Sequence, residues 1–288
     1  MRSRGGGYGE SLRRLCGSVL NNEPSGGLIE LARLNKVLLH YLRVNGVNGA
    51  VRDSEEAKLR AVVKIVEEVR DALSGLNYAF FKLVKPVTYT PADVDVLVAS
   101  SEVNEAALRL IRLGFRLMVV EPYTITLVKN GINVDLYTNP SVGNIVYLNG
   151  ADLLGFKAMD HYHGLSIPTL TREAEVVVAA AHAVYKEWLI TLNDYATVKT
   201  WISRGAVELC LRMKCSEALG LVLSIGESAC SGLIEMPYRI KTPLVMALLA
   251  NRALRFKPTA STIPMATRRL NDARLINLVT SKLSRLTY

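Results

Sequence analysis

The stretch D-V-D-V-L-V, residues 93–98, decides the fold predicted for this chain, because it sets two carboxylates in an otherwise apolar run. Side chains two residues apart on a strand point to the same face, so Asp93 and Asp95 lie together and the valines occupy the other face. Two like charges at that spacing repel each other unless a cation lies between them. A divalent ion fits this need, because Mg²⁺ or Mn²⁺ prefers carboxylate oxygens and Mg²⁺ leaves positions free for phosphates.

A third carboxylate stands alone in the later apolar stretch I-N-V-D-L-Y, residues 132–137. Asn130-Gly131 precedes it and is a strong signal for a two-residue hairpin turn. If this strand lies beside residues 93–98, Asp135 joins the first two carboxylates at one edge of the sheet. Three such carboxylates can hold two metal ions, one that activates an attacking oxygen and one that steadies a leaving pyrophosphate.

The surrounding pattern predicts an α/β (α+β) fold with a small mixed sheet. Helical spacing of apolar residues covers residues 27–46, 53–75 and 100–114. Strand patterns cover residues 77–87, 93–99, 116–122, 123–130 and 132–139. After about residue 150 the strand signals fade, and helices are predicted over residues 171–203, 206–229, 242–256 and 265–286.

Length and composition indicate two domains and an anionic partner. The 288 residues suggest a flexible basic tail over 1–25, an α/β domain over 26–150 and a helical domain over 151–288. The net charge of +9 favours a nucleotide or nucleic acid as partner. No apolar run approaches the roughly 18 residues that span a bilayer, so we expect a cytoplasmic protein without membrane contact.

The four cysteines, Cys16, Cys210, Cys215 and Cys230, show no spacing typical of a zinc site. We interpret them as reduced residues that mostly serve packing.

The order of helix, strand, D-V-D-V-L-V, helix and later V-D-L resembles the nucleotidyltransferase superfamily of polymerase beta, whose signature is a paired hDhD motif followed by a third carboxylate on a neighbouring strand. Residues 164–196 are similar to nucleotidyltransferase-like families and to related toxins of abortive-infection toxin–antitoxin systems. The resemblance covers roughly residues 54–200. It implies transfer of a nucleoside monophosphate from an NTP, with Asp93 and Asp95 as metal ligands and Asp135 completing the site.

One stretch departs from the pattern of these families. Members usually carry a Gly-Ser or Lys-Gly pair at the end of the first strand, where small residues let the backbone approach the triphosphate. This chain reads F-F-K-L-V-K-P-V-T-Y-T-P over residues 80–91 and has no glycine there. We expect Lys82 and Lys85 to supply charge and Thr88 and Thr90 to supply hydroxyls to the nucleotide. The alternative is a protein that has kept the fold and lost catalysis, acting as a nucleotide- or RNA-binding module related to toxin–antitoxin systems.

The helix predicted after residue 171 borders the nucleotide cleft in the resembling families, so Lys186 is expected to reach a phosphate and Asp194 to orient it. The equal alternative for Lys186 is a solvated helix face, with His182 as a satisfied core histidine. His161 and His163 could form a metal-binding H-x-H pair. We interpret them as part of a polar loop, because no strand pattern or third ligand accompanies them.

Basic residues cluster near both ends of the chain, and RNA (tRNA-like) or protein is the expected acceptor of the nucleotide. Charge with little aromatic interleaving fits contact with phosphates better than reading of bases. Ordinary surface charge explains these residues equally well. The clusters contain Arg2, Arg4, Arg13 and Arg14, and then Arg252, Arg255, Lys257, Arg268, Arg269, Arg274, Lys282 and Arg285.

Overall fold

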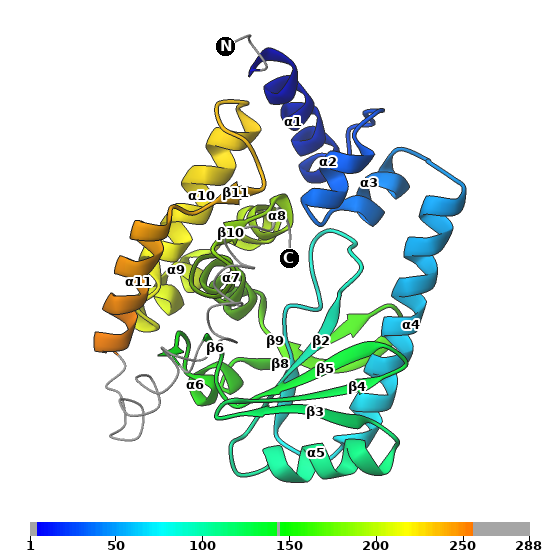
Figure 1. Cartoon of the computed structure of the whole chain (residues 1–288), viewed down its shortest axis with the longest axis vertical. Helices are drawn as coiled ribbons and strands as arrows, with labels where there is room; N and C mark the ends of the chain where they lie inside the picture. The colour runs from blue at the N-terminus through cyan, green and yellow to red at the C-terminus, as the bar shows by residue number, and fades with distance from the viewer. Residues whose placement is uncertain (1–4, 143–144, 256–288) are drawn as a thin grey trace.

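A seven-stranded mixed sheet forms the centre of the computed structural model, which describes residues 5–142 and 145–255. Along the sheet the strands follow the order β3-β4-β5-β2-β1-β9-β8 (Figure 1). They are β1 (Tyr78–Phe80), β2 (Asp93–Val98), β3 (Arg116–Glu121), β4 (Thr124–Lys129), β5 (Ile132–Tyr137), β8 (Lys157–Tyr162) and β9 (Leu165–Leu170). Short two-stranded pairs join β6 (Ser141–Val142) to β7 (Ile145–Val146) and β10 (Leu189–Ile190) to β11 (Tyr238–Arg239). The expected α/β fold with a mixed sheet is confirmed.

Two apolar clusters surround this sheet. One joins buried residues of α4 and α5 to the sheet, and the other joins α1–α3 to the helices that follow β9. Figure 1 shows α4 on one side of the molecule and α7, α9, α10 and α11 on the other. The helices are α1 (Gly5–Leu20), α2 (Ile29–Leu34), α3 (Leu38–Val44), α4 (Ala50–Ala72), α5 (Val103–Arg112), α6 (Gly150–Leu154), α7 (Arg172–Ala181), α8 (Leu192–Trp201), α9 (Arg204–Arg212), α10 (Ser216–Cys230) and α11 (Thr242–Arg255).

The register of β2 and β5 brings the isolated carboxylates together. These strands run parallel, and Asp95 lies directly opposite Asp135. The β4–β5 hairpin turns at Asn130 and Gly131, whose φ angles are 52° and 77°. Two positive φ values are the mark of a type I′ turn, so the hairpin predicted from the Asn-Gly pair is confirmed.

Two predictions about strands are corrected. The strand expected over residues 77–87 ends at Phe80, because Lys82 has a φ of 60° and its backbone N–H turns away to the carboxylate of Glu175. The predicted loss of strands after residue 150 is wrong, because β8 and β9 form a hairpin and β9 pairs with β1. The sheet therefore continues past the boundary that we placed at residue 150.

The N-terminal region is also more ordered than predicted. Residues 5–20 form α1 rather than a flexible tail, and Leu12, Leu15 and Val19 are buried in the helical cluster. The helix expected over residues 27–46 is divided into α2 and α3 where Lys36 adopts a φ of 57°.

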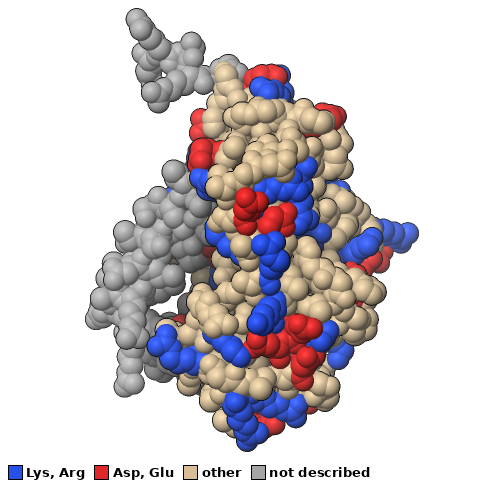
Figure 2. All heavy atoms as spheres, turned by 90° about the vertical axis from the view of Figure 1, so that its right-hand side faces the viewer, with Lys and Arg blue, Asp and Glu red and all other residues tan. Residues whose placement is uncertain are grey.

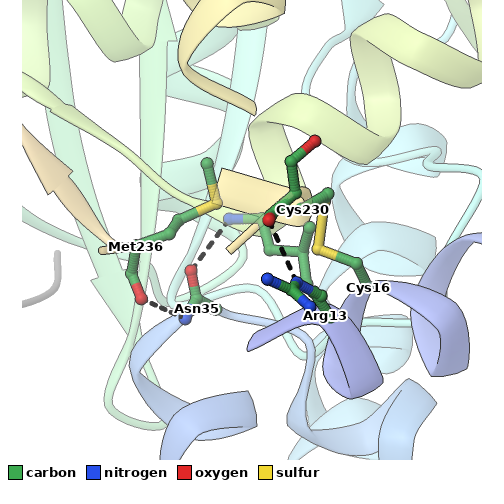
Figure 3. The surroundings of a disulfide bond; sticks show 7 residues. Arg13, Cys16, Asn35, Cys230 and Met236 are labelled. Carbon is green, nitrogen blue, oxygen red and sulfur yellow. Dashed lines mark hydrogen bonds between the residues drawn. A yellow bond between two sulfur atoms is a disulfide. The ribbon is translucent and has the colours of Figure 1, made fainter. Parts of the chain in front are cut away.

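A disulfide fixes α1 to α10. Cys16 and Cys230 are bonded, which corrects the interpretation of all four cysteines as reduced (Figure 3). Cys210 and Cys215 are free and buried, as expected for packing residues. Beside the disulfide, Nε of Arg13 donates to the carbonyl of Ser231 at 3.0 Å (Figure 3). The first helix is thus held at several points.

The segment after β9 begins with a helix that changes its pitch. Residues His182–Glu187 continue α7 as a π-helix, Trp188 then turns with a φ of 57°, and α8 follows after β10. The sequence of residues 171–203 predicts one long helix or two abutting helices, and the structure has two with this interruption. The helix predicted over 265–286 lies outside the described residues. Within the described ranges, none of the helices has the length and apolar character needed to cross a membrane.

Candidate functional site

Three carboxylates converge on one face of the sheet. Oxygens of Asp93, Asp95 and Asp135 all lie within 4.8 Å of one another. Asp95 is 4% exposed, and its Oδ1 is buried without a hydrogen-bond partner in the described residues. Asp135 accepts hydrogen bonds from Thr126 Oγ1 at 2.7 Å and from the Tyr137 hydroxyl at 3.3 Å. A buried carboxylate oxygen without a partner is costly, so this trio has the chemistry of a cation site.

The ammonium group of Lys82 forms an ion pair with one of these carboxylates. Its Nζ lies 2.7 Å from Asp95 Oδ2, and both side chains are largely buried. Burial lowers the pKa of the Lys82 ammonium, but the carboxylates of Asp95 and Asp93 outweigh burial and hold that pKa above its usual value. Burial raises the pKa of Asp95 to about 6 even though Lys82 lowers it. Within the pair, the attraction between Lys82 and Asp95 opposes the effect of burial on both groups.

The backbone of Lys82 adopts the left-handed conformation that glycine usually provides. With a φ of 60°, this lysine lies in the segment after β1 where the resemblance led us to expect a glycine. Its N–H donates to both carboxylate oxygens of Glu175, at 2.8 and 3.1 Å, which stabilises the turn. Burial raises the pKa of Glu175 to about 7, while Lys85 and the Lys82 N–H lower it.

A cleft of about 190 Å³ opens beside the carboxylates and is lined by lysines from three parts of the chain. Lys82 and Lys85 come from the segment after β1, Lys186 from the π-helical turn, and Lys36 from the turn between α2 and α3. Asp93, Asp95, Glu187 and Asp194 also line it. The cleft thus combines Asp93 and Asp95 with ammonium groups, which is a suitable pairing for a metal and a polyphosphate, while Asp135 lies next to these carboxylates without lining the cleft.

Lys36 was not among the residues predicted from the sequence. Burial lowers the pKa of its ammonium to about 8, partly against the raising effect of Asp194 and Asp93. Its carbonyl accepts a hydrogen bond from Nδ2 of Asn193 at 2.9 Å. The only sequence signal was a lysine within an otherwise leucine-rich helical pattern, and helical spacing alone does not reveal that the helix breaks there.

Asn35 holds this turn against the helical layer. Its Nδ2 donates to the carbonyl of Met236 at 2.9 Å (Figure 3), and its Oδ1 accepts from the N–H of Leu192 at 3.1 Å. Asn35 is fully buried, so both bonds replace contacts with water. The position of Lys36 in the cleft follows from these contacts.

The structure brings Lys186, Asp194 and His182 to the cleft. Lys186 Nζ donates to the hydroxyl of Tyr137 at 2.9 Å, on the strand that carries Asp135. Asp194 accepts from the N–H and the hydroxyl of Thr191, at 2.9 and 2.6 Å, and caps the start of α8. The Nε2 of His182 lies 3.2 Å from Lys82 Nζ. His182 is thus buried, as the interpretation of a core histidine predicted, and it also lines the cleft.

Other sequence candidates lie elsewhere. Neither Thr88 nor Thr90 is among the described residues that line the cleft, and Thr88 accepts from Arg43 at 3.5 Å instead. The polar loop expected around His161 and His163 is a β-hairpin, with His161 exposed on β8 and His163 in the turn at a φ of 47°.

Only part of the predicted basic clusters lies within the described residues. Arg252 is fully buried, lies 4.5 Å from the Tyr185 ring centroid and donates to the carbonyl of Met213, so its place in an exposed basic cluster is corrected. Arg13 and Arg14 of α1 bond to nearby backbone or serine oxygens. Figure 2 shows basic and acidic side chains interspersed rather than one basic field on the face that it presents. Outside the described residues lie Arg2, Arg4, Lys257, Arg268, Arg269, Arg274, Lys282 and Arg285, and the side chain of Arg255 is likewise not described.

Fold and site share the arrangement implied by the resemblance to nucleotidyltransferases, namely a mixed sheet with two carboxylates on one strand and a third on its parallel neighbour. Among solved structures, the chain is similar to a protein of Thermotoga maritima described as a nucleotidyltransferase, with 19% identity, 40% of this chain and 81% of that chain covered, and a TM-score of 0.31. It is also similar to the lincosamide antibiotic adenylyltransferase LnuA, with 16% identity, 51% and 95% coverage, and a TM-score of 0.33.

A third similar structure is the antibiotic-resistance factor ANT(2'')-Ia, with 13% identity, 61% of this chain and 96% of that chain covered, and a TM-score of 0.37. No protein-family model and no curated protein matches the chain. The site residues, rather than these partial overlaps, support the function proposed below.

Proposed function

We propose that this protein is a metal-dependent nucleotidyltransferase that moves a nucleoside monophosphate from an NTP to a hydroxyl of RNA or protein. The observation that carries the proposal is the trio of carboxylate oxygens within 4.8 Å, one of them buried without a hydrogen-bond partner in the described residues. Ordinary surface carboxylates are solvated and do not leave an oxygen in that state.

The donors present fit a magnesium or manganese ion. Asp93, Asp95 and Asp135 would hold it through oxygens, the ligands that such hard cations prefer. When bound, the ion would draw charge from the phosphate under attack and from the leaving pyrophosphate. Lys82 balances part of the acidic charge of the trio through its contact with Asp95.

The lysines of the cleft are assigned to the phosphates. Lys36, Lys85 and Lys186 approach from three segments and would bind the triphosphate as point charges. The acceptor hydroxyl attacks the α-phosphorus, the bond to the pyrophosphate oxygen breaks, and the proton passes to a carboxylate or to solvent. Asp194, which caps the start of α8 and lines the same cleft, is assigned to orienting the phosphate that Lys186 reaches.

The test incubates the purified chain with each labelled NTP, with Mg²⁺ or Mn²⁺, and separately with bulk tRNA or with its own polypeptide as acceptor. We expect label transfer in one of these mixtures and at least a hundredfold loss in Asp95→Asn and Asp135→Asn, because both remove charge from the trio. The matched control, Asp160→Asn on β8, changes a carboxylate that lies outside the trio. Equal transfer by Asp95→Asn and wild type would refute the proposal.

A second candidate is a binding module without catalysis, related to the toxin–antitoxin proteins named above. The contact of Lys82 with Asp95 favours it, since a lysine can take the place of a metal ion as counter-charge. In that case calorimetry should show NTP binding that does not depend on Mg²⁺, and no mixture should transfer label. Binding should weaken in Lys186→Ala and remain in Asp135→Asn.

A further inference from the structure

Among the described residues, an apolar surface is exposed to solvent at one edge of the sheet. Of the fifteen large hydrophobic residues that are exposed in the described chain, seven lie between residues 108 and 120. Three follow α5 or sit on it, and four are consecutive in β3: Leu117, Met118, Val119 and Val120, the last 65% exposed. Apolar residues gathered in this way usually mark a contact surface.

The strand β3 is also the edge of the sheet. It pairs with β4 alone, so the backbone groups on its outer side have no strand beside them in the described structure. Edge strands are normally protected by charge or by a covering segment. The opposite edge, β8, follows that rule with Lys157, Asp160 and His161. All six residues of β3 are exposed, and charge is limited to its two ends.

The residues of β3 are arranged so that the strand complements itself. Arg116 lies opposite Val128 and Glu121 opposite Thr124, and these β4 residues share one face because they are four apart. A register shift between Leu117 and Val119 makes this possible, since residues five apart on a regular strand would face opposite sides. Arg116 and Glu121 therefore share one face of the sheet, and Leu117 and Val120 share the other.

We propose that β3 joins two copies of this chain in an antiparallel, edge-to-edge pair. A two-fold axis perpendicular to the sheet keeps each face on its own side and reverses the strand direction. Pairing about a point between Met118 and Val119 then places Arg116 opposite the partner's Glu121 at both ends, and Leu117 opposite the partner's Val120. The bulge interrupts backbone pairing at the centre, so side-chain contacts and the two ion pairs carry the association. This inference is independent of the proposed chemistry.

The first test is the mass of the full-length chain by analytical ultracentrifugation at roughly 1–100 µM, the range in which moderate homodimers dissociate. We expect a dimer in the wild type and a monomer in Val119→Lys with an unchanged circular dichroism spectrum. The control Met159→Lys introduces the same charge at an exposed apolar residue of the other edge, 64% exposed, and should remain dimeric. A monomeric wild type, or a dimeric Val119→Lys variant, would overturn the proposal.

A charge exchange tests the register. In the dimer, Arg116→Glu places two glutamates opposite each other at both ends of the strand pair, and Glu121→Arg places two arginines there. We expect each variant to raise the dissociation constant about tenfold or more. The double variant restores opposite charges across the two-fold axis and should return the dissociation constant to within about threefold of the wild type. Folded single variants that dimerise like the wild type, or a folded double variant that stays monomeric, would exclude this pairing.

Discussion

At residue 82 the chain combines a left-handed backbone turn with a charged side chain that contacts a carboxylate of the site. The left-handed backbone that a glycine would adopt is present with a φ of 60°, and the side chain adds an ammonium 2.7 Å from Asp95. A non-glycine residue in this conformation costs roughly 1–2 kcal/mol, which the Glu175 hydrogen bonds and the ion pair offset. The absence of glycine upstream of the carboxylates therefore does not mean that the turn is absent.

Glu175 should make the stability of the protein pH-dependent. Its pKa rises from the ordinary 4.5 to about 7 in the folded state because the group is buried, so the folded protein binds a proton that the unfolded chain releases. The resulting stabilisation is complete below pH 4.5 and is lost as the pH rises through 7. We expect Glu175→Gln to remove about 3 kcal/mol of this decrease, measured by urea unfolding between pH 5 and 8.

The control for this experiment is Glu173→Gln on the same helix, where the side chain is half-buried and lines a different hollow, beside Gly205 and Arg212. It should keep the slope of the wild type. If Glu175→Gln and the wild type show the same slope, another group causes the pH dependence.

The site residues that could be predicted from sequence are those whose signal is local. Asp93, Asp95 and Asp135 stand out because carboxylates interrupt apolar strands, and strand periodicity is enough to place Asp93 and Asp95 on one face. Lys36 and Glu175 could not be predicted, since their places depend on a helix break and on the packing of α7 against the segment after β1. The register of β2 with β5 was a condition in the prediction and is a fact of the structure.

Helices and strands with a local sequence signal could also be predicted, whereas those that depend on distant contacts could not. The β4–β5 hairpin was predictable because Asn-Gly specifies its own turn. The β8–β9 hairpin was not, because the exposed strand β8 mixes polar and apolar residues and has only one face against the protein. The burial of α1 was missed for a similar reason, as its glycine-rich sequence gains order from contact with α10 and from the disulfide.

A pair of identical substitutions at two glycines should have opposite effects. Gly131→Ala forces an alanine to a φ of 77° in the turn before Asp135, and we expect a loss of about 1 kcal/mol of unfolding free energy. Gly220→Ala lies inside α10 with open space around the new methyl group, and should gain up to about 1 kcal/mol. Urea unfolding of both variants measures the difference. A stabilising Gly131→Ala would contradict the turn described here.

At the scale of the whole molecule, the disulfide joins residues 214 positions apart. Such a link restricts the unfolded chain, so we expect the double substitution of Cys16 and Cys230 by serine to lower the unfolding free energy by about 2–5 kcal/mol. Dithiothreitol should lower the stability of the wild type and leave the double variant unchanged.

Thiol titration of the denatured protein provides the direct measurement. Two reactive thiols before reduction and four afterwards would agree with the disulfide, whereas four before reduction would disprove it. Structural disulfides are rare in reducing compartments, so the same count on protein taken directly from cells also tests the expectation of a cytoplasmic location.

The turn at Asn35 and Lys36 has a consequence for how far the candidate site can be separated from the rest of the chain. All three carboxylates and most of the cleft belong to residues 78–194, yet one wall is built by a lysine that precedes them and is fastened by Asn35 to residues 192 and 236. A fragment trimmed to the seven-stranded sheet would retain its acidic charges and lose one of the ammonium groups that line the cleft. The sheet alone therefore does not contain the whole candidate site, because the turn between α2 and α3 supplies Lys36 to the cleft.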